Sequence, residues 1–186
     1  MTIRPDESDL LTERLLALRT VLISGPMETE RATRYAAMLL TLEAESRKSI
    51  SVRLHSLGGD LEPALMLADT IDLLKAPVEI TCVAEVSGAA LALLTATDSR
   101  TATAHARFHL VEPRAALPPG PGRATEVATI AEAHEHLLDR FADRLGDATG
   151  RTRDEVRSTI APPGKVLDAE AALNWGLINS IVTTAR

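Results

Sequence analysis

The sequence predicts an α/β fold built as one domain, and three observations lead to this prediction. Strand-like and helix-like segments alternate along the chain. The 186 residues suffice for one domain with a full hydrophobic core and leave little room for a second. Apolar residues make up 45% and charged residues 25% of the chain, a composition typical of a globular domain. Because aromatic residues are only 2%, the core must be built from Leu, Ile, Val and Ala.

The first half of the chain contains two units in which a strand is followed by a helix. We expect, in order, a strand over residues 19–24, a helix over 29–45, a strand over 49–55 and a helix over 60–75. The first strand ends in a Gly25-Pro26 turn, and the second alternates apolar with polar residues. After Gly58-Gly59, Asp60 is placed to cap the second helix, with Pro63 near its first turn.

The second half continues the alternation and adds a long helix. We expect a strand over 78–84, a helix of small residues over 88–96, a strand over 107–111, a break over 117–122, a helix over 124–148 and a closing strand over 177–182. Before the closing strand, Asp168 caps a last helix that ends at Gly176. No linker divides the chain, which favours a single domain.

Composition excludes several classes of function. With 26 acidic and 20 basic residues the net charge is −6, which disfavours nucleic acid as a partner. Cys82 is the one cysteine and no Cys/His cluster occurs, so we expect no metal or cofactor. The first residues lack the pattern of a signal peptide, and no apolar run is long enough for a membrane span. These observations predict a cytoplasmic protein that does not associate with membranes.

Four segments together carry a resemblance to a known family. They are RLLALRTVLISGPM, HSLGGD, ITCVAEVSGAALALLTA and DAEAALNWGLINSIV. In this order and spacing the chain resembles the ClpP family, the proteolytic subunit of the ATP-dependent Clp protease, over residues 14–182. The resemblance implies a ClpP/crotonase-type spiral of β-β-α units with a protruding handle helix. We therefore expect an N-terminal segment over 1–13 and one ClpP-like domain over 14–186, with the handle at about 112–148.

The resemblance also implies a Ser-His-Asp triad, but the three matching positions carry other residues. Aligned from three separate anchors, the nucleophile, histidine and aspartate positions fall on Gly88, Val111 and Gly164. Neither glycine nor valine can abstract a proton or form an acyl intermediate. The Gly58-Gly59 loop matches the family's oxyanion loop, although two glycines also suit a tight turn. The chain is thus predicted to be a divergent, catalytically inactive member with a structural or regulatory role in a ring assembly.

Two alternatives stay open at this point. In the first, the active site has shifted to Ser87 and His109, with Asp168 or Glu112 as the acid, and the chain is a serine endopeptidase of the Clp type. Ser87 could equally cap the helix that follows it, and His109 could be an ordinary strand residue. In the second, the chain binds acyl-CoA as crotonases do.

The resemblance implies partners, and the sequence departs from the family at two partner surfaces. ClpP proteins form two stacked rings that AAA+ unfoldases feed. Here the strand beside the handle is replaced by the proline-rich residues 117–122, which disfavours strand pairing between rings. Ser51 and Arg53 occupy the place of the aromatic residues that anchor an unfoldase, so docking of an unfoldase is doubtful. We expect a homo-oligomer, or a hetero-oligomer with an active ClpP paralogue.

Overall fold

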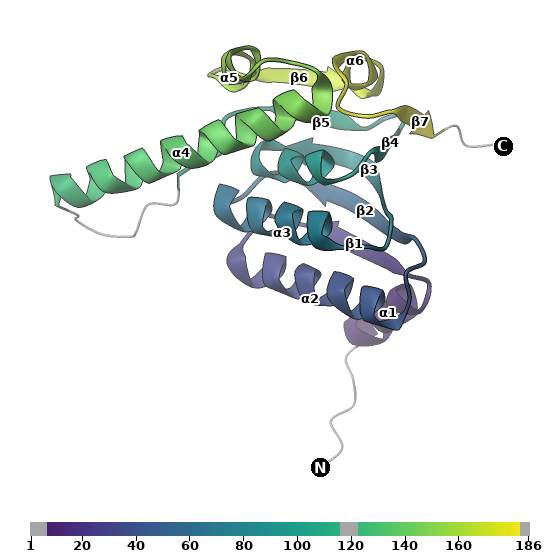
Figure 1. Ribbon diagram of the computed structural model, residues 1–186. Helices are drawn as coiled ribbons and strands as arrows, with labels where there is room; N and C mark the ends of the chain where they lie inside the picture. Colours follow the sequence, from purple (N-terminus) through teal and green to yellow (C-terminus); the bar gives the residue numbers. More distant parts are fainter. Residues whose placement is uncertain (1–6, 116–122, 183–186) are drawn as a thin grey trace.

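The computed structural model describes residues 7–115 and 123–182 of the chain. A seven-stranded sheet forms its centre, with α2 and α3 side by side against it (Figure 1). The strands are β1 Thr20–Ser24, β2 Ile50–Ser56, β3 Val78–Ser87, β4 Ser99–Thr103, β5 Arg107–Leu110, β6 Lys165–Asp168 and β7 Ser180–Val182. The helices are α1 Glu7–Ala17, α2 Thr29–Glu45, α3 Leu61–Leu73, the 3-10 helix η1 Gly88–Ala96, α4 Ala124–Thr149, α5 Arg153–Ile160 and α6 Ala169–Trp175. The predicted α/β class is confirmed.

The long strand β3 organises the sheet because it pairs with different strands along its length. The main order is β1-β2-β3-β4-β7, and every pair in it is parallel. The first part of β3 pairs with β4, and its last residues, Glu85 to Ser87, pair with β5. β5 then pairs antiparallel with β6. This fork brings the ends of β3 and β5 together beside the loop that follows β2.

The two faces of the sheet differ in chemistry. One face carries buried aliphatic side chains, and α3 and η1 pack against it. The other face carries, in one row of register, Leu22, Arg53, Thr81, Thr101 and Ser180. In that row the Thr81 hydroxyl accepts a hydrogen bond from the Arg53 guanidinium at 2.5 Å and another from the Thr101 hydroxyl at 3.0 Å. Except for Leu22, this row of the second face is thus polar, and Arg53, Thr81 and Thr101 form a hydrogen-bonded ladder in it.

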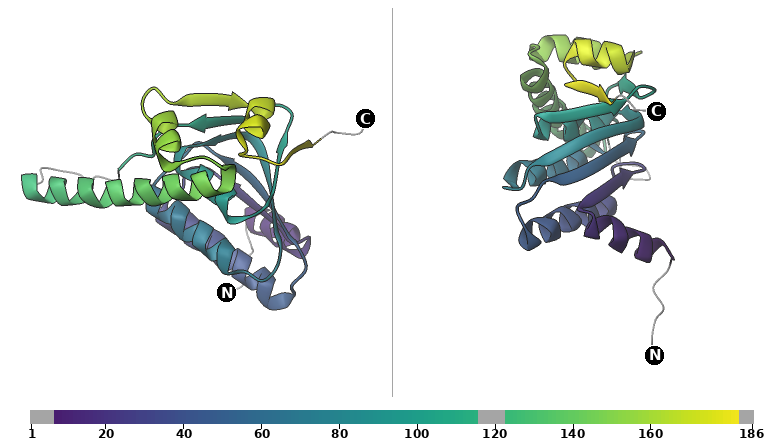
Figure 2. Two further views of the ribbon diagram at one scale, coloured as in Figure 1. Left: turned by 45° about the horizontal axis from the view of Figure 1, so that its top comes forward. Right: turned by 90° about the vertical axis from the view of Figure 1, so that its right-hand side faces the viewer.

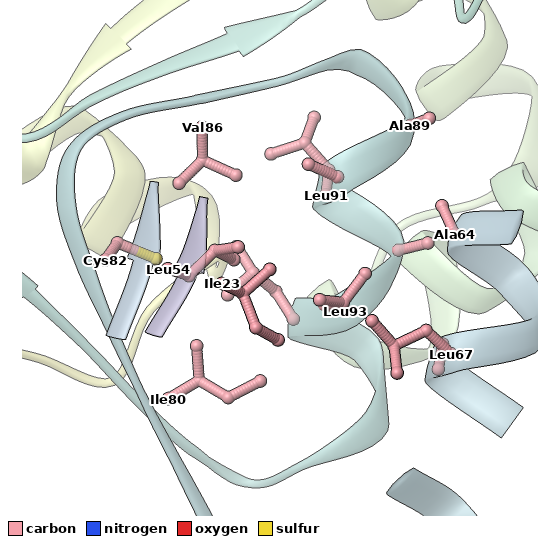
Figure 3. Close-up of a cluster of buried hydrophobic side chains, with 14 of the residues drawn as sticks. Ile23, Leu54, Ala64, Leu67, Ile80, Cys82, Val86, Ala89, Leu91 and Leu93 are labelled. Atoms are coloured by element: carbon pink, nitrogen blue, oxygen red, sulfur yellow. The ribbon is translucent and has the colours of Figure 1, made fainter. Parts of the chain in front are cut away.

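The core lies where β1, β2 and β3 meet α3 and η1 (Figure 3). Leu54 and Ile80 from the sheet face Leu67 of α3 and Leu93 of η1, and all four are fully buried. Cys82 lies among them, and its burial raises the pKa of the thiol to about 12. A thiol held in its neutral form is not a nucleophile, so Cys82 is a core residue.

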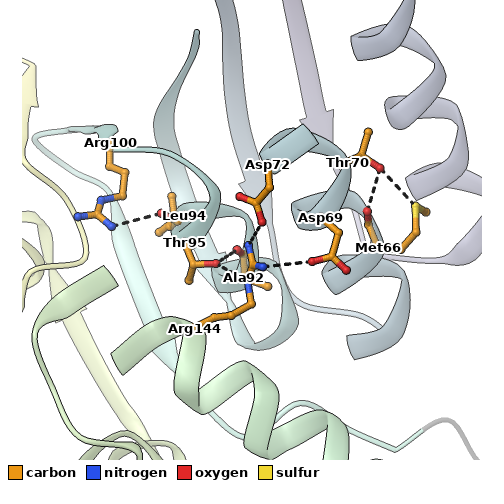
Figure 4. Close-up of polar contacts among 9 residues, drawn as sticks. All are labelled: Met66, Asp69, Thr70, Asp72, Ala92, Leu94, Thr95, Arg100 and Arg144. Atoms are coloured by element: carbon orange, nitrogen blue, oxygen red, sulfur yellow. Dashed lines mark hydrogen bonds and ion pairs between the residues drawn. The ribbon is translucent and has the colours of Figure 1, made fainter. Parts of the chain in front are cut away.

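Helix α4 is anchored at its C-terminal half and projects from the body at its other end (Figures 1 and 2). Arg144 donates to the carboxylates of Asp69 and Asp72 on α3 at 3.1 and 2.8 Å, and to the Thr95 hydroxyl of η1 at 2.9 Å (Figure 4). Nearby, the buried Arg100 donates to the carbonyl oxygen of Ala148 at 3.1 Å. In contrast, residues 123–129 are all exposed. The predicted handle helix is confirmed.

Several helices and strands were missed by the sequence prediction, and others have different bounds or a different helix type. The helices α1 and α5 and the strands β4 and β6 were not predicted, and α1 runs across the expected start of the domain at Arg14. The closing strand begins only at Ser180, and Leu177 and Ile178 are instead buried in the segment that follows α6. The small-residue segment after β3 adopts the tighter 3-10 form.

Asp60 precedes α3 as expected, but its side chain makes no capping hydrogen bond. The proline-rich break over 117–122 lies outside the described residues. Within the described ranges, no helix combines the length and the apolar character that crossing a membrane requires.

Candidate active-site cleft

The glycine loop after β2 is fixed by the turn that follows β1. The Ser56 hydroxyl donates to the carbonyl oxygens of Gly25 and Gly58 at 2.7 and 3.2 Å. The Met27 amide donates to the Gly58 carbonyl at 2.8 Å. A β-carbon on Gly59 would lie only 2.2 Å from the Met27 nitrogen, so no other residue fits there. The geometry therefore supports a structural reason for glycine at 59.

Gly88, aligned with the nucleophile, lies at the junction of β3 and η1. Its φ of +50° is in the left-handed region, and the residue is buried. A β-carbon built on it would lie 3.7 Å from the Cγ2 atom of Val111, which is ordinary van der Waals contact. Positions 88 and 111 are therefore close enough for their side chains to touch, and a small side chain has room at 88.

Gly164, aligned with the aspartate, approaches the same valine from the other side. It lies between α5 and β6, with a φ of +77°. A β-carbon built on it would lie 2.7 Å from both the Leu110 carbonyl oxygen and the Val111 Cγ1 atom. The three aligned positions thus converge on Val111. The space that a side chain at 164 would need is filled by Val111 and the β5 backbone.

A cavity of about 380 Å³ opens in front of this cluster. It is lined by residues 57–60, 87–89 and 111–114. The charged residues among the described ones that line the cavity are Asp60, Glu112 and Arg114. The sequence did not predict a role for Arg114, and its only connection to a candidate was its position two residues after Glu112. Among the described residues that line it are Ser87 and no histidine, so the cavity does not hold a serine and histidine pair.

Ser87 and His109, the shifted candidates, lie directly opposite each other on the paired strands β3 and β5. The His109 Nε2 atom is buried and has no hydrogen-bond partner among the described residues. No hydrogen bond joins the two side chains in the part of the chain that the structure describes. Ser87 lines the cavity, whereas His109 does not.

Asp168, the acid of the shifted set, is engaged elsewhere. Its carboxylate accepts a hydrogen bond from the Ala171 amide at 2.8 Å and so caps α6, as predicted. On β6 it is paired with Arg107, while Val166 is the residue opposite His109. The structure therefore brings Ser87 and His109 to adjacent strands and assigns Asp168 a structural bond. Among the described residues, no group of His, Cys, Asp and Glu side chains could hold a metal ion.

Topology and cleft together define an α/β protein of the ClpP/crotonase fold type, with a forked parallel sheet and a projecting handle helix. The family model for Clp protease matches residues 4–185, and the chain belongs to this family. Proteins of the ClpP family form oligomeric rings.

A solved structure of a ClpP1 mutant from Listeria monocytogenes is similar, with a TM-score of 0.79 and 24% sequence identity. The match covers 94% of this chain and 96% of that chain. This likeness shows that the fold is that of ClpP.

Proposed function

We propose that this chain is a non-hydrolytic ClpP-like subunit that acts in a ring assembly. One observation carries the proposal: Gly88, Val111 and Gly164 converge as a triad would, and none supplies a nucleophile, a base or an acid. In a triad enzyme, removal of these groups leaves only what the oxyanion donors and binding contribute. The packing around Gly164 supports the same reading, because no carboxylate side chain fits at that position as the backbone stands.

A structural or regulatory role explains why the fold persists without the chemistry. The core is fully packed and the handle is anchored, so the chain keeps what a ring subunit needs. The proposed assembly pairs this chain with an active ClpP paralogue, whose activity or access it adjusts. Docking of an unfoldase on the open sheet face is disfavoured, because Arg53 and Thr81 form a polar ladder where an apolar anchor would be required.

The first test measures covalent labelling by a fluorophosphonate serine probe, read as intact mass and mapped by peptide sequencing. We expect no adduct on the folded chain and a full adduct on an active ClpP. The double variant Gly88→Ser/Val111→His should gain an adduct at position 88, since the two side chains would be in contact. Gly88→Ser alone should react far less, because it has no base. A folded double variant that stays unlabelled would contradict the assignment of these positions.

A shifted active site is the alternative that one observation favours: Ser87 is opposite His109 in the strand register, and within residues 7–115 and 123–182 the imidazole Nε2 atom has no hydrogen-bond partner. An adduct on the unmodified chain that maps to Ser87 would establish this alternative and end the inactive-subunit proposal. Ser87→Ala should then abolish the adduct. The matched control is Ser99→Ala, which removes an exposed strand hydroxyl and should leave labelling unchanged.

Ring partnership is tested separately by co-expression of the tagged chain with an active ClpP paralogue from the same genome. We expect the two to co-purify under native conditions in a particle with the mass of a ring. Purification of this chain free of any ClpP paralogue would count against a mixed ring.

A further inference from the structure

The strand β3 contains a bulge that lies opposite His55 of β2, shortly before β3 reaches the cleft. The two strands are neighbours at the centre of the sheet (Figure 1). Their register shifts between Leu54 and Ser56, so that His55 alone lies opposite residues 83–85. A bulge bends its strand and changes the direction of the residues that follow it. Here the residues that follow are those of the cleft.

The backbone of the bulge is strained at Ala84. Its φ of +61° lies in the left-handed region, which a residue with a β-carbon rarely adopts. The side chain of Ala84 is exposed, so burial does not hold the residue in this conformation. Strained backbone persists where neighbouring groups fix it. His55 supplies such a contact at the next residue, Glu85.

The imidazole of His55 lies beside both polar groups of the Glu85 backbone. Its Nδ1 atom is 3.3 Å from the Glu85 amide nitrogen and 3.1 Å from the Glu85 carbonyl oxygen. An unprotonated Nδ1 accepts a hydrogen bond from the amide, whereas a protonated Nδ1 donates one to the carbonyl. In the imidazolium both ring nitrogens carry a proton, so the Nδ1 and amide N–H groups then face each other. The direction of the hydrogen bond therefore depends on the charge of His55.

The bulge adjoins both walls of the cleft. On β2, His55 is followed by Ser56, whose hydroxyl donates to the carbonyl oxygen of Gly58 in the glycine loop. On β3, Ser87 comes two residues after Glu85 and lines the cavity. A displacement of the Glu85 amide is therefore transmitted to the cavity wall over two residues of strand.

The charged side chains around the bulge come from four strands. Arg53 precedes His55 by two residues on β2, and β1 places an uncharged serine opposite His55. Glu85 of β3 is paired with Arg107 of β5, which is paired with Asp168 of β6. Carboxylates and arginines ordinarily keep their charge between about pH 5 and 8, whereas histidine ordinarily changes its charge there. A change at the bulge within this range is therefore expected to come from the imidazole.

We propose that His55 is a pH-dependent switch that sets the shape of the β3 bulge and, through the bulge, the shape of the cleft. A neutral imidazole accepts from the Glu85 amide and holds the bulge as observed. Protonation reverses the hydrogen bond and displaces the amide, and the strain at Ala84 favours the rearrangement. The proposal goes beyond the non-hydrolytic role and does not depend on it, because the switch acts whether or not the cleft hydrolyses a substrate.

The first test reads the protonation of the ring nitrogens of His55 by nuclear magnetic resonance. The full chain is labelled with ¹⁵N in its histidine side chains, and the signals of His55 are those that disappear in His55→Asn. We expect a proton on Nε2 and none on Nδ1 at about pH 8, and a proton on both at about pH 5. A proton on Nδ1 at both pH values would overturn the proposal, because the hydrogen bond would never reverse.

The second test follows the backbone amides of the uniformly labelled full chain over the same pH range. We expect the amide signals of Ala84, Glu85, Ser87 and Gly88 to shift together, with the midpoint found for the His55 ring. Signals of Ser87 and Gly88 that stay fixed while His55 titrates would overturn the link between the bulge and the cleft. This measurement uses the unmodified chain, so it does not depend on how any variant folds.

Variants assign the transition to one group. In His55→Asn the side-chain amide has its oxygen and nitrogen as many bonds from the backbone as Nδ1 and does not titrate, so the shifts of the bulge and cleft amides should be lost. The controls are His109→Asn, which removes an imidazole opposite Ser87, and Glu85→Gln, which removes a carboxylate at the bulge. Both should keep the transition, and circular dichroism should show that all three variants are folded. A transition that survives in His55→Asn, or that is lost in either control, would assign it to another group and overturn the proposal.

Discussion

The core beneath β3 and the cleft at the end of β3 use the same strand and differ in what their residues contribute. In the core, Ile80 and Cys82 of β3 are fully buried in one apolar cluster with Leu67 of α3 and Leu93 of η1 (Figure 3). In the cleft, a few residues further along the chain, Gly88 occupies the position that the resemblance aligns with the nucleophile. The non-hydrolytic proposal concerns only this end of the strand, because the packing of the core is the same whether or not the chain hydrolyses a substrate.

The largest expected effect is in the core. Leu67→Ala removes a fully buried side chain and leaves a cavity between α3 and the sheet. The free energy of unfolding should fall by about 2–5 kcal/mol, measured by urea denaturation with circular dichroism. Leu73→Ala is the matched control, because the same atoms are removed from an exposed position in the same helix. A loss for Leu67→Ala no larger than that for Leu73→Ala would contradict this description of the core.

The two glycines aligned with triad positions, Gly88 and Gly164, offer the sharpest comparison, because each has a positive φ and only Gly88 has space for a β-carbon. Gly164→Ala places a methyl group 2.7 Å from the Leu110 carbonyl oxygen and should lower the free energy of unfolding by about 2–4 kcal/mol. Gly88→Ala has only ordinary contacts and should lower it by about 1 kcal/mol, the conformational part alone. Urea denaturation of the two variants measures the difference. Equal losses would show that Val111 yields easily and that the acid position is not closed.

The sequence predicted the elements that carry apolar periodicity and missed those that do not. The strand β4 was not predicted because its core-facing positions include Arg100, which is 7% exposed and donates to backbone carbonyls of η1 and α4. An arginine at a core-facing position interrupts the alternation of apolar and polar residues by which a strand is predicted from sequence. The helix α5 is short and polar, and its capping box of Thr152 and Glu155 was the signal available for it.

For the cleft, the resemblance aligned three positions with a triad, which stays a prediction, and it did not predict how these positions pack. That Val111 and the Leu110 carbonyl fill the space beside Gly164 depends on how β5 approaches β6, which spacing along the chain does not encode. His109 does not line the cavity although Val111 does, and β5 ends at Leu110, between the two. Strand alternation alone placed His109 and Val111 on one face.

The smallest expected effect is the difference in stability loss between removing the carboxylate of Asp168, which caps a helix, and that of Asp60, which lines the cleft. Asp168 caps α6 through the Ala171 amide, so Asp168→Ala should lower the free energy of unfolding by about 1 kcal/mol. Asp60 precedes α3 without a side-chain hydrogen bond, so Asp60→Ala retains every capping contact and should lower it by less than about 0.5 kcal/mol. Thermal melts of the two variants beside the wild type measure this difference.

A shifted catalytic acid would show the reverse pattern for Asp168→Ala, with little change in stability and loss of labelling at Ser87. A clear loss of stability with unchanged labelling would instead assign Asp168 to the fold, as its bond to Ala171 indicates.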